Sequence, residues 1–159
     1  MRKRCGSILV VVGLALAVAM HAAPQNEKKA AATAQKVSIR DPWIAEGPPT
    51  ARATGGFFVA ENSGEKEAAI VEVKSDLFRS IELHEVVNEN NSMSMRKMER
   101  FRIPARGKLT LQPGGYHLMM FGVARPLRAG DKVSLTLRFE DGSEARVEAE
   151  VRRRQERGM

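Results

Sequence analysis

KVSLTLRFEDGSEARVEAEV, at residues 132–151, is the most regular pattern in the chain. Apolar and polar side chains alternate strictly on both sides of Asp141-Gly142. Successive side chains of a β-strand point to opposite faces, so the alternation predicts two strands that each bury one face. An Asp-Gly pair between two such runs is typical of a tight hairpin turn. The segment therefore predicts an antiparallel β-hairpin.

Short apolar runs of the same kind precede this hairpin from Val37 onward. Polar turn residues at 61–64, 88–91 and 113–115 separate several of them. The runs expected to form strands are 37–44, 54–60, 68–73, 81–87, 93–98, 109–111 and 116–121. Short strands at this spacing predict an all-β, antiparallel sandwich or barrel.

The N-terminus has the pattern of a secretory signal. Basic residues at 2–4 precede an uncharged apolar run of 13 residues, Ile8 to Met20. The run is shorter than the roughly 20 residues that cross a bilayer, and Ala17-Val18-Ala19 supplies a cleavage pattern. We therefore expect a signal peptide at 1–19, export to the periplasm, and a mature form that does not span the membrane. An uncleaved signal would instead tether the protein to the membrane.

Three further segments follow the expected signal. Residues 20–36 contain almost no bulky aliphatic side chains and are interpreted as a flexible linker. Residues 37–152 form the expected domain. Residues 153–159 form a basic tail that could steer a partner or simply be solvated.

Composition excludes several classes of function. The single cysteine, Cys5, lies before the apolar run, so the mature chain would have no disulfide, thiolate nucleophile or iron–sulfur cluster. The formal net charge is +7, but the basic residues are not interleaved with aromatic ones. We therefore expect no nucleic-acid partner.

The expected domain has two histidines, His84 and His117, with methionines gathered around them. In a strand, residues i and i+2 point to the same face, so His117 and Met119 can bind one ion together. Met93 and Met95 share a face in the same way. Thioethers are soft, neutral ligands that favour Cu(I) over Zn²⁺, Mg²⁺ or Ca²⁺, and imidazole nitrogens are compatible with them.

Core packing is the competing interpretation of these residues. A methionine in a β-sandwich usually fills an irregular gap, and Met98 and Met120 are assigned to packing for that reason. The residues alone leave metal binding and packing open for the others. They also leave open whether Met93 can replace Met95.

A longer pattern resembles a known family. His84 is followed by ten residues and Met95, then by twenty-one residues and His117, then by Leu118 and Met119. This spacing, with flanks such as Glu82-Leu83-His84-Glu85, resembles the signature of the PCu(A)C family of periplasmic copper chaperones. The resemblance covers about residues 37–151.

The resemblance implies a cupredoxin-like Greek-key β-sandwich or barrel. It also implies one Cu(I) held by His84, Met95, His117 and Met119, with delivery of the ion to a copper-accepting protein. That partner would be a cytochrome c oxidase subunit or another assembly factor for the oxidase copper site.

Three other functions compete with the copper chaperone. An electron-transfer cupredoxin needs a cysteine thiolate, which the mature chain would lack. An enzyme is not expected, because G-x-S-x-G, P-loop and H-E-x-x-H motifs are absent from the sequence. A metal-free structural module would tolerate His84→Ala and show no copper affinity.

Overall fold

The structure is a computed structural model that describes residues 33–34, 36–48, 50–89 and 92–153. The expected signal peptide, most of the expected linker and nearly all of the basic tail lie outside the described residues. Ten strands form the domain, and their bounds are β1 Val37–Glu46, β2 Ala53–Asn62, β3 Ala68–Lys74, β4 Phe78–Glu89, β5 Ser92–Met98, β6 Phe101–Ile103, β7 Lys108–Thr110, β8 Tyr116–Val123, β9 Lys132–Phe139 and β10 Glu144–Arg153.

The predicted hairpin is confirmed as β9 and β10, which pair antiparallel from Glu144↔Arg138 to Glu150↔Lys132. Gly142 adopts a positive φ of 84°, which glycine tolerates without a Cβ clash. Asp141 accepts hydrogen bonds from the backbone and the hydroxyl of Ser143 at 3.0 and 2.6 Å. Turn chemistry and side-chain alternation therefore agree on this register.

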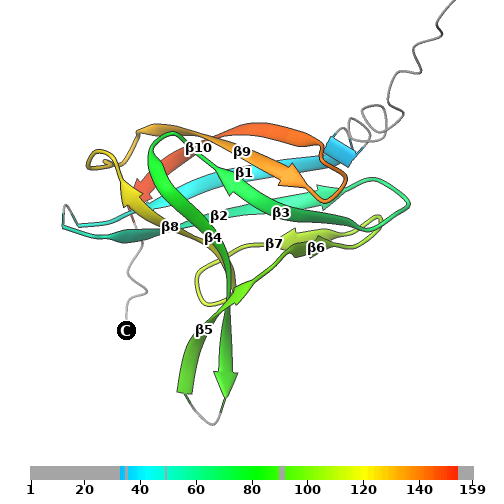
Figure 1. The fold of residues 1–159 in the computed structure, drawn as a ribbon, viewed down its shortest axis with the longest axis horizontal. Coiled ribbons are helices and arrows are strands. Elements are labelled where there is room, and N and C mark those ends of the chain that lie inside the picture. Colours follow the sequence, from blue (N-terminus) through cyan, green and yellow to red (C-terminus); the bar gives the residue numbers. More distant parts are fainter. Residues whose placement is uncertain (1–32, 35, 49, 90–91, 154–159) are drawn as a thin grey trace, which may run out of the picture.

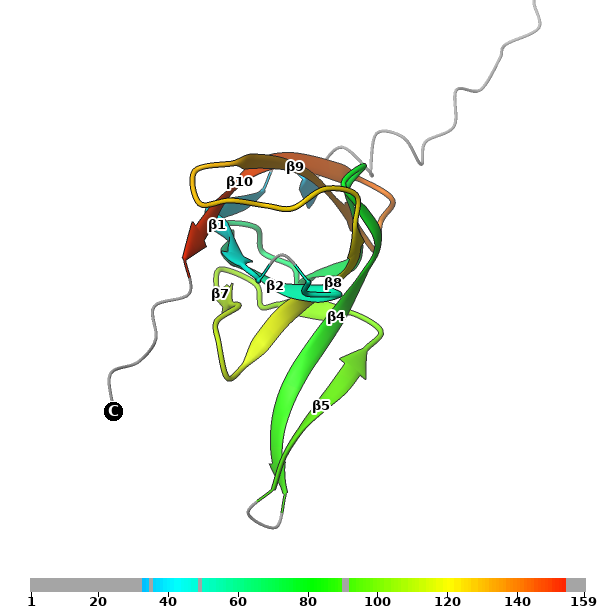
Figure 2. The ribbon, with the colours of Figure 1, turned by 90° about the vertical axis from the view of Figure 1, so that its left-hand side faces the viewer.

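The strands form one sheet in the order β5-β4-β8-β2-β1-β10-β9-β3-β6, with β7 paired to β2. The sheet curls round into a barrel-like shape with β9 and β10 on one side and β2 and β8 on the other (Figure 2). This is the expected all-β, cupredoxin-like fold. Apolar side chains of the alternating strands fill its interior, among them Phe58, Leu118, Leu135 and Val151.

Two features differ from the expected strand pattern. The first and last strands of the domain, β1 and β10, run side by side in the same direction, so their pairing is parallel. Alternation along each strand is local and carries no information on which distant strand lies next to it. The three residues of β6, Phe101–Ile103, were not expected as a strand.

The longest strand, β4, has 12 residues and extends beyond the barrel together with β5. Both strands project downward as a hairpin in Figures 1 and 2. Near the barrel, β4 pairs with β8 on one side and with β5 on the other. Among the residues that the structure describes, no helix is long and apolar enough to cross a membrane.

Candidate metal centre

The two histidines are direct cross-strand partners. His84 on β4 lies opposite His117 on β8, and Glu82 lies opposite Met119 two pairs further along. Paired residues point to the same face of a sheet, so all four side chains lie on one face. The ring centroids of His84 and His117 are 5.8 Å apart. A third strand and a loop complete the site around them.

Met95 reaches the same face from β5, where it lies opposite Val86 of β4. Met95, His117 and Met119 line one surface hollow of about 200 Å³. The loop before β8 contributes Pro113 and Gly114 to its wall. The structure therefore brings His84 and Met95 together with His117 and Met119, from three different strands.

Burial changes steeply across the site. His117 is 6% exposed, whereas Met95 is 60% exposed and Met93 is 69% exposed. Met93 lies opposite Asn88 near the tip of the β4–β5 hairpin, on the same face as Met95. The hollow thus runs from the nearly buried imidazole of His117 to the exposed side chain of Met95. A ligand there could be reached from outside without unfolding the domain.

The hydrogen bonds of the two imidazoles use opposite ring nitrogens. Nδ1 of His117 donates to the carbonyl oxygen of Gly115 at 3.0 Å, which leaves its Nε2 lone pair free. Nε2 of His84 lies 3.0 Å from Oε2 of Glu82. The Nδ1 of His84 is buried and has no hydrogen-bond partner among the described residues.

A partner for this nitrogen would be favourable, because burial of a polar atom without one costs free energy. Each histidine therefore offers one nitrogen, and Met95 and Met119 add two thioether sulfurs. Within the described residues, no group of three or more His, Cys, Asp or Glu side chains could hold a metal ion. The donor set fits a soft, singly charged ion such as Cu(I).

The carboxylate of Glu82 lies next to the imidazole of His84. It accepts from Nζ of Lys97 at 2.8 Å and pairs with His84 through its other oxygen. These two hydrogen bonds hold the pKa of Glu82 below its usual range, and the bond from Lys97 has the larger effect of the two. Glu82 therefore carries its negative charge at neutral pH.

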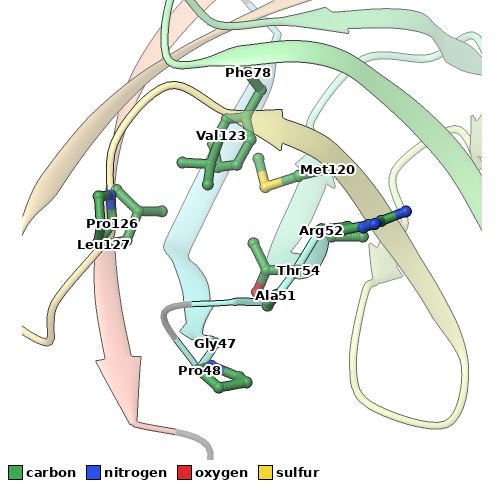
Figure 3. A pocket seen from close by; sticks show the side chains of 11 residues that line it. Gly47, Pro48, Ala51, Arg52, Thr54, Phe78, Met120, Val123, Pro126 and Leu127 are labelled. Carbon is green, nitrogen blue, oxygen red and sulfur yellow. The ribbon is translucent and has the colours of Figure 1, made fainter.

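Neither Met98 nor Met120 belongs to the hollow, as expected. Met98 lies opposite Leu83 on the other face of β4 and packs against the core. Met120 is fully buried, and its sulfur borders a separate apolar hollow of about 30 Å³ between Thr54, Phe78 and Leu127 (Figure 3). The assignment of both to packing is confirmed.

Sequence reasoning missed the roles of Glu82 and Lys97 around His84. Glu82 stands two residues before His84, which is the spacing of side chains on one strand face. Lys97 lies directly opposite His84 in the register, and only strand pairing reveals that. The first residue was therefore within reach of a sequence argument and the second was not.

Comparisons with known proteins place this chain in a family. The model of the LpqE-like family, described as candidate lipoproteins, matches residues 37–151. Lxx21020 of Leifsonia xyli subsp. xyli, named as a candidate lipoprotein, is 42% identical over 100 residues, which cover 62% of this chain and 60% of that protein. RP573 of Rickettsia prowazekii is 28% identical over 96 residues, which cover 60% of this chain and 53% of that protein. The chain thus matches little more than half of these relatives' length.

Solved structures share the fold. The copper-bound PCuAC domain from PmoF2 superposes with a TM-score of 0.65 at 23% identity, covering 75% of this chain and 94% of that one. The Cu(I) form of DR1885 from Deinococcus radiodurans has a TM-score of 0.60 at 31% identity, covering 84% of this chain and 89% of that one. Because the family model matches residues 37–151, the chain belongs to the LpqE-like family of proteins, and its fold is that of the PCuAC domains.

Proposed function

We propose that this protein is a periplasmic copper metallochaperone, which binds one Cu(I) through His84, Met95, His117 and Met119 and passes it to a partner. The observation that carries the proposal is the strand register. It puts both histidines side by side and brings the two methionines to the same face. The free nitrogen on each imidazole and the exposed side chain of Met95 support the same conclusion.

Binding and transfer, rather than catalysis, are what this donor set favours. Imidazoles and thioethers bind as neutral groups, so the site keeps the single positive charge of Cu(I). The exposed Met95 side chain can be replaced first by a ligand from an acceptor. Structures of similar proteins contain copper, which supports the choice of ion.

The proposed acceptor is a copper site of cytochrome c oxidase or one of its assembly factors. Export to the periplasm is part of the proposal, since thioethers persist in an oxidising compartment where a free thiolate is at risk. Cell fractionation of the tagged full chain tests the compartment. Recovery in the cytoplasm would contradict it.

Anaerobic titration with Cu(I) against a competing chelator tests the binding. We expect one tightly bound equivalent for the native protein. The quadruple variant His84→Ala, Met95→Ala, His117→Ala, Met119→Ala should bind none at the same chelator strength. Absence of binding by the native protein would leave a metal-free structural module.

A matched pair of variants on β5, Met95→Leu and Met98→Leu, distinguishes copper ligation from core packing. Met95→Leu conserves volume at an exposed position, so we expect the free energy of unfolding to change by less than about 0.5 kcal/mol. Its Cu(I) affinity should fall at least tenfold, while Met98→Leu, on the opposite face, should retain native affinity. Equal affinities would mean that Met95 is not a ligand, or that Met93 replaces it. The double variant Met93→Leu, Met95→Leu tells these two cases apart.

A further inference from the structure

Glu82 joins β4 and β5, the two strands that carry two of the proposed ligands, His84 and Met95. One carboxylate oxygen lies 3.0 Å from Nε2 of His84, and the other accepts from Nζ of Lys97 on β5 at 2.8 Å. Lys97 is itself the register partner of His84. The three side chains thus form a chain of hydrogen bonds from an exposed cation to a mostly buried imidazole, whose side chain is 14% exposed.

This chain determines which nitrogen of His84 remains free. A carboxylate accepts hydrogen bonds and donates none when ionised, so Nε2 must carry the proton in the neutral imidazole. Nδ1 then keeps its lone pair, and it is the buried atom that lacks a partner. In His117 the backbone carbonyl of Gly115 accepts a hydrogen bond from Nδ1, which therefore carries the proton and leaves Nε2 free.

We infer that Glu82, clamped by Lys97, is a positioning residue that makes Nδ1 the copper-binding nitrogen of His84, opposite Nε2 of His117. The inference rests on the proposed function for the identity of the ion. A carboxylate behind a ligating imidazole fixes its tautomer and orientation and raises its basicity. Here it also supplies a negative charge near a cation held only by neutral ligands. Lys97 keeps that carboxylate in place from the same strand that carries Met95.

The first test needs no metal. Long-range ¹H–¹⁵N correlation spectra of the full chain distinguish protonated from unprotonated ring nitrogens in each histidine. At a pH where both rings are neutral, we expect His84 to be protonated at Nε2 and His117 at Nδ1. The same tautomer in both rings, or a proton on Nδ1 of His84, would overturn the inference.

The second test uses the same spectra after addition of Cu(I), which is diamagnetic. The ¹⁵N shift change should fall on Nδ1 of His84 and on Nε2 of His117. A change at Nε2 of His84 would contradict the inference even if copper binds tightly. Failure of the native protein to bind Cu(I) would instead contradict the proposed function, and the metal-free spectra would still test the tautomers.

Two variants of Glu82 and one control variant of Glu85 test the contribution of Glu82. Glu82→Ala should weaken Cu(I) binding by about 10- to 100-fold, the range found when the hydrogen-bond partner of a metal ligand is removed. Glu82→Gln should recover part of this loss, because its amide oxygen can accept from Nε2 but has no charge. Native affinity in Glu82→Ala would exclude the positioning role.

Glu85 provides the matched control. It lies on the opposite face of β4 and forms an equivalent pair with Arg96 of β5 at 2.8 Å. Glu85→Ala should therefore leave the affinity within about threefold of native and the two tautomers unchanged. A loss equal to that in Glu82→Ala would show that any ion pair along this hairpin has the same effect, which would overturn the specific role of Glu82.

Discussion

Adjacent methionines on β8 have opposite environments at the scale of single residues. Met119 lies on the face with His117 and lines the surface hollow, whereas Met120 is fully buried against the core. In the register, Met119 lies opposite Glu82 and Met120 opposite Ile81. Because side chains alternate along a strand, one residue step separates a candidate ligand from a core residue.

Alanine substitutions of this pair should therefore have different effects. Met120→Ala leaves a core cavity, so we expect the free energy of unfolding to fall by about 2–5 kcal/mol while Cu(I) affinity is retained. Met119→Ala should cost about 1 kcal/mol or less and abolish tight Cu(I) binding. Urea unfolding of the metal-free proteins and chelator competition measure the two effects. A stable Met120→Ala variant would contradict its assignment to the core.

At the scale of elements, β1 and β10 are joined at a local irregularity. The register of β1 with β2 shifts between Arg40 and Trp43, and Asp41 there adopts a positive φ of 46°. Its carboxylate accepts from Arg152 of β10 at 2.7 Å. This hydrogen bond is the main cause that lowers the pKa of Asp41. The ion pair thus links the first and last strands of the barrel beside their parallel junction.

Asp41→Asn tests this link through its pH dependence. Asparagine tolerates the left-handed backbone but removes the charge. Because the pair is exposed, we expect a loss of less than about 1 kcal/mol at pH 7. A lowered carboxyl pKa stabilises the native state above the pKa of the unfolded chain, and this stabilisation is lost as the pH falls through the folded pKa.

Urea unfolding of the native protein and of Asp41→Asn at several pH values measures this difference. The two proteins should differ most near neutral pH and converge in acid. A difference that stays constant from pH 7 to pH 2 would mean that the substitution acts through backbone strain instead.

At the scale of the whole molecule, the candidate site joins three strands of one sheet and lies near its β5 edge. β5 ends the strand order, and nearly all of its side chains are exposed. An ion held by β4, β5 and β8 would therefore tie the projecting hairpin to the barrel. Binding and folding should be coupled through this connection.

Cu(I) should accordingly stabilise the native protein against denaturation. Binding to the native state alone adds about 2.7 kcal/mol when free ligand is 100 times the dissociation constant. Urea unfolding at buffered free Cu(I), under anaerobic conditions, should show this gain for the native protein and none for the quadruple variant. An equal gain in both would mean that copper binds elsewhere.

Sequence alone determined most of the strands, their faces and the candidate ligands. Alternation along 132–151 predicted β9 and β10, and i, i+2 spacing correctly separated Met119 from Met120. These properties are local, so neighbouring residues suffice to reveal them. The copper assignment came from the spacing of His84, Met95, His117 and Met119, which resembles a family signature.

Only the tertiary structure decided how these elements meet. The parallel pairing of β1 with β10, the position of His84 opposite His117, and that of Lys97 opposite His84 all depend on the register of strands distant in the sequence. Which ring nitrogen stays free depends on the hydrogen bonds that His84 donates to Glu82 and His117 donates to the backbone carbonyl of Gly115. Such contacts form only when distant segments pack together, because their directions and distances are properties of the whole fold rather than of any local stretch.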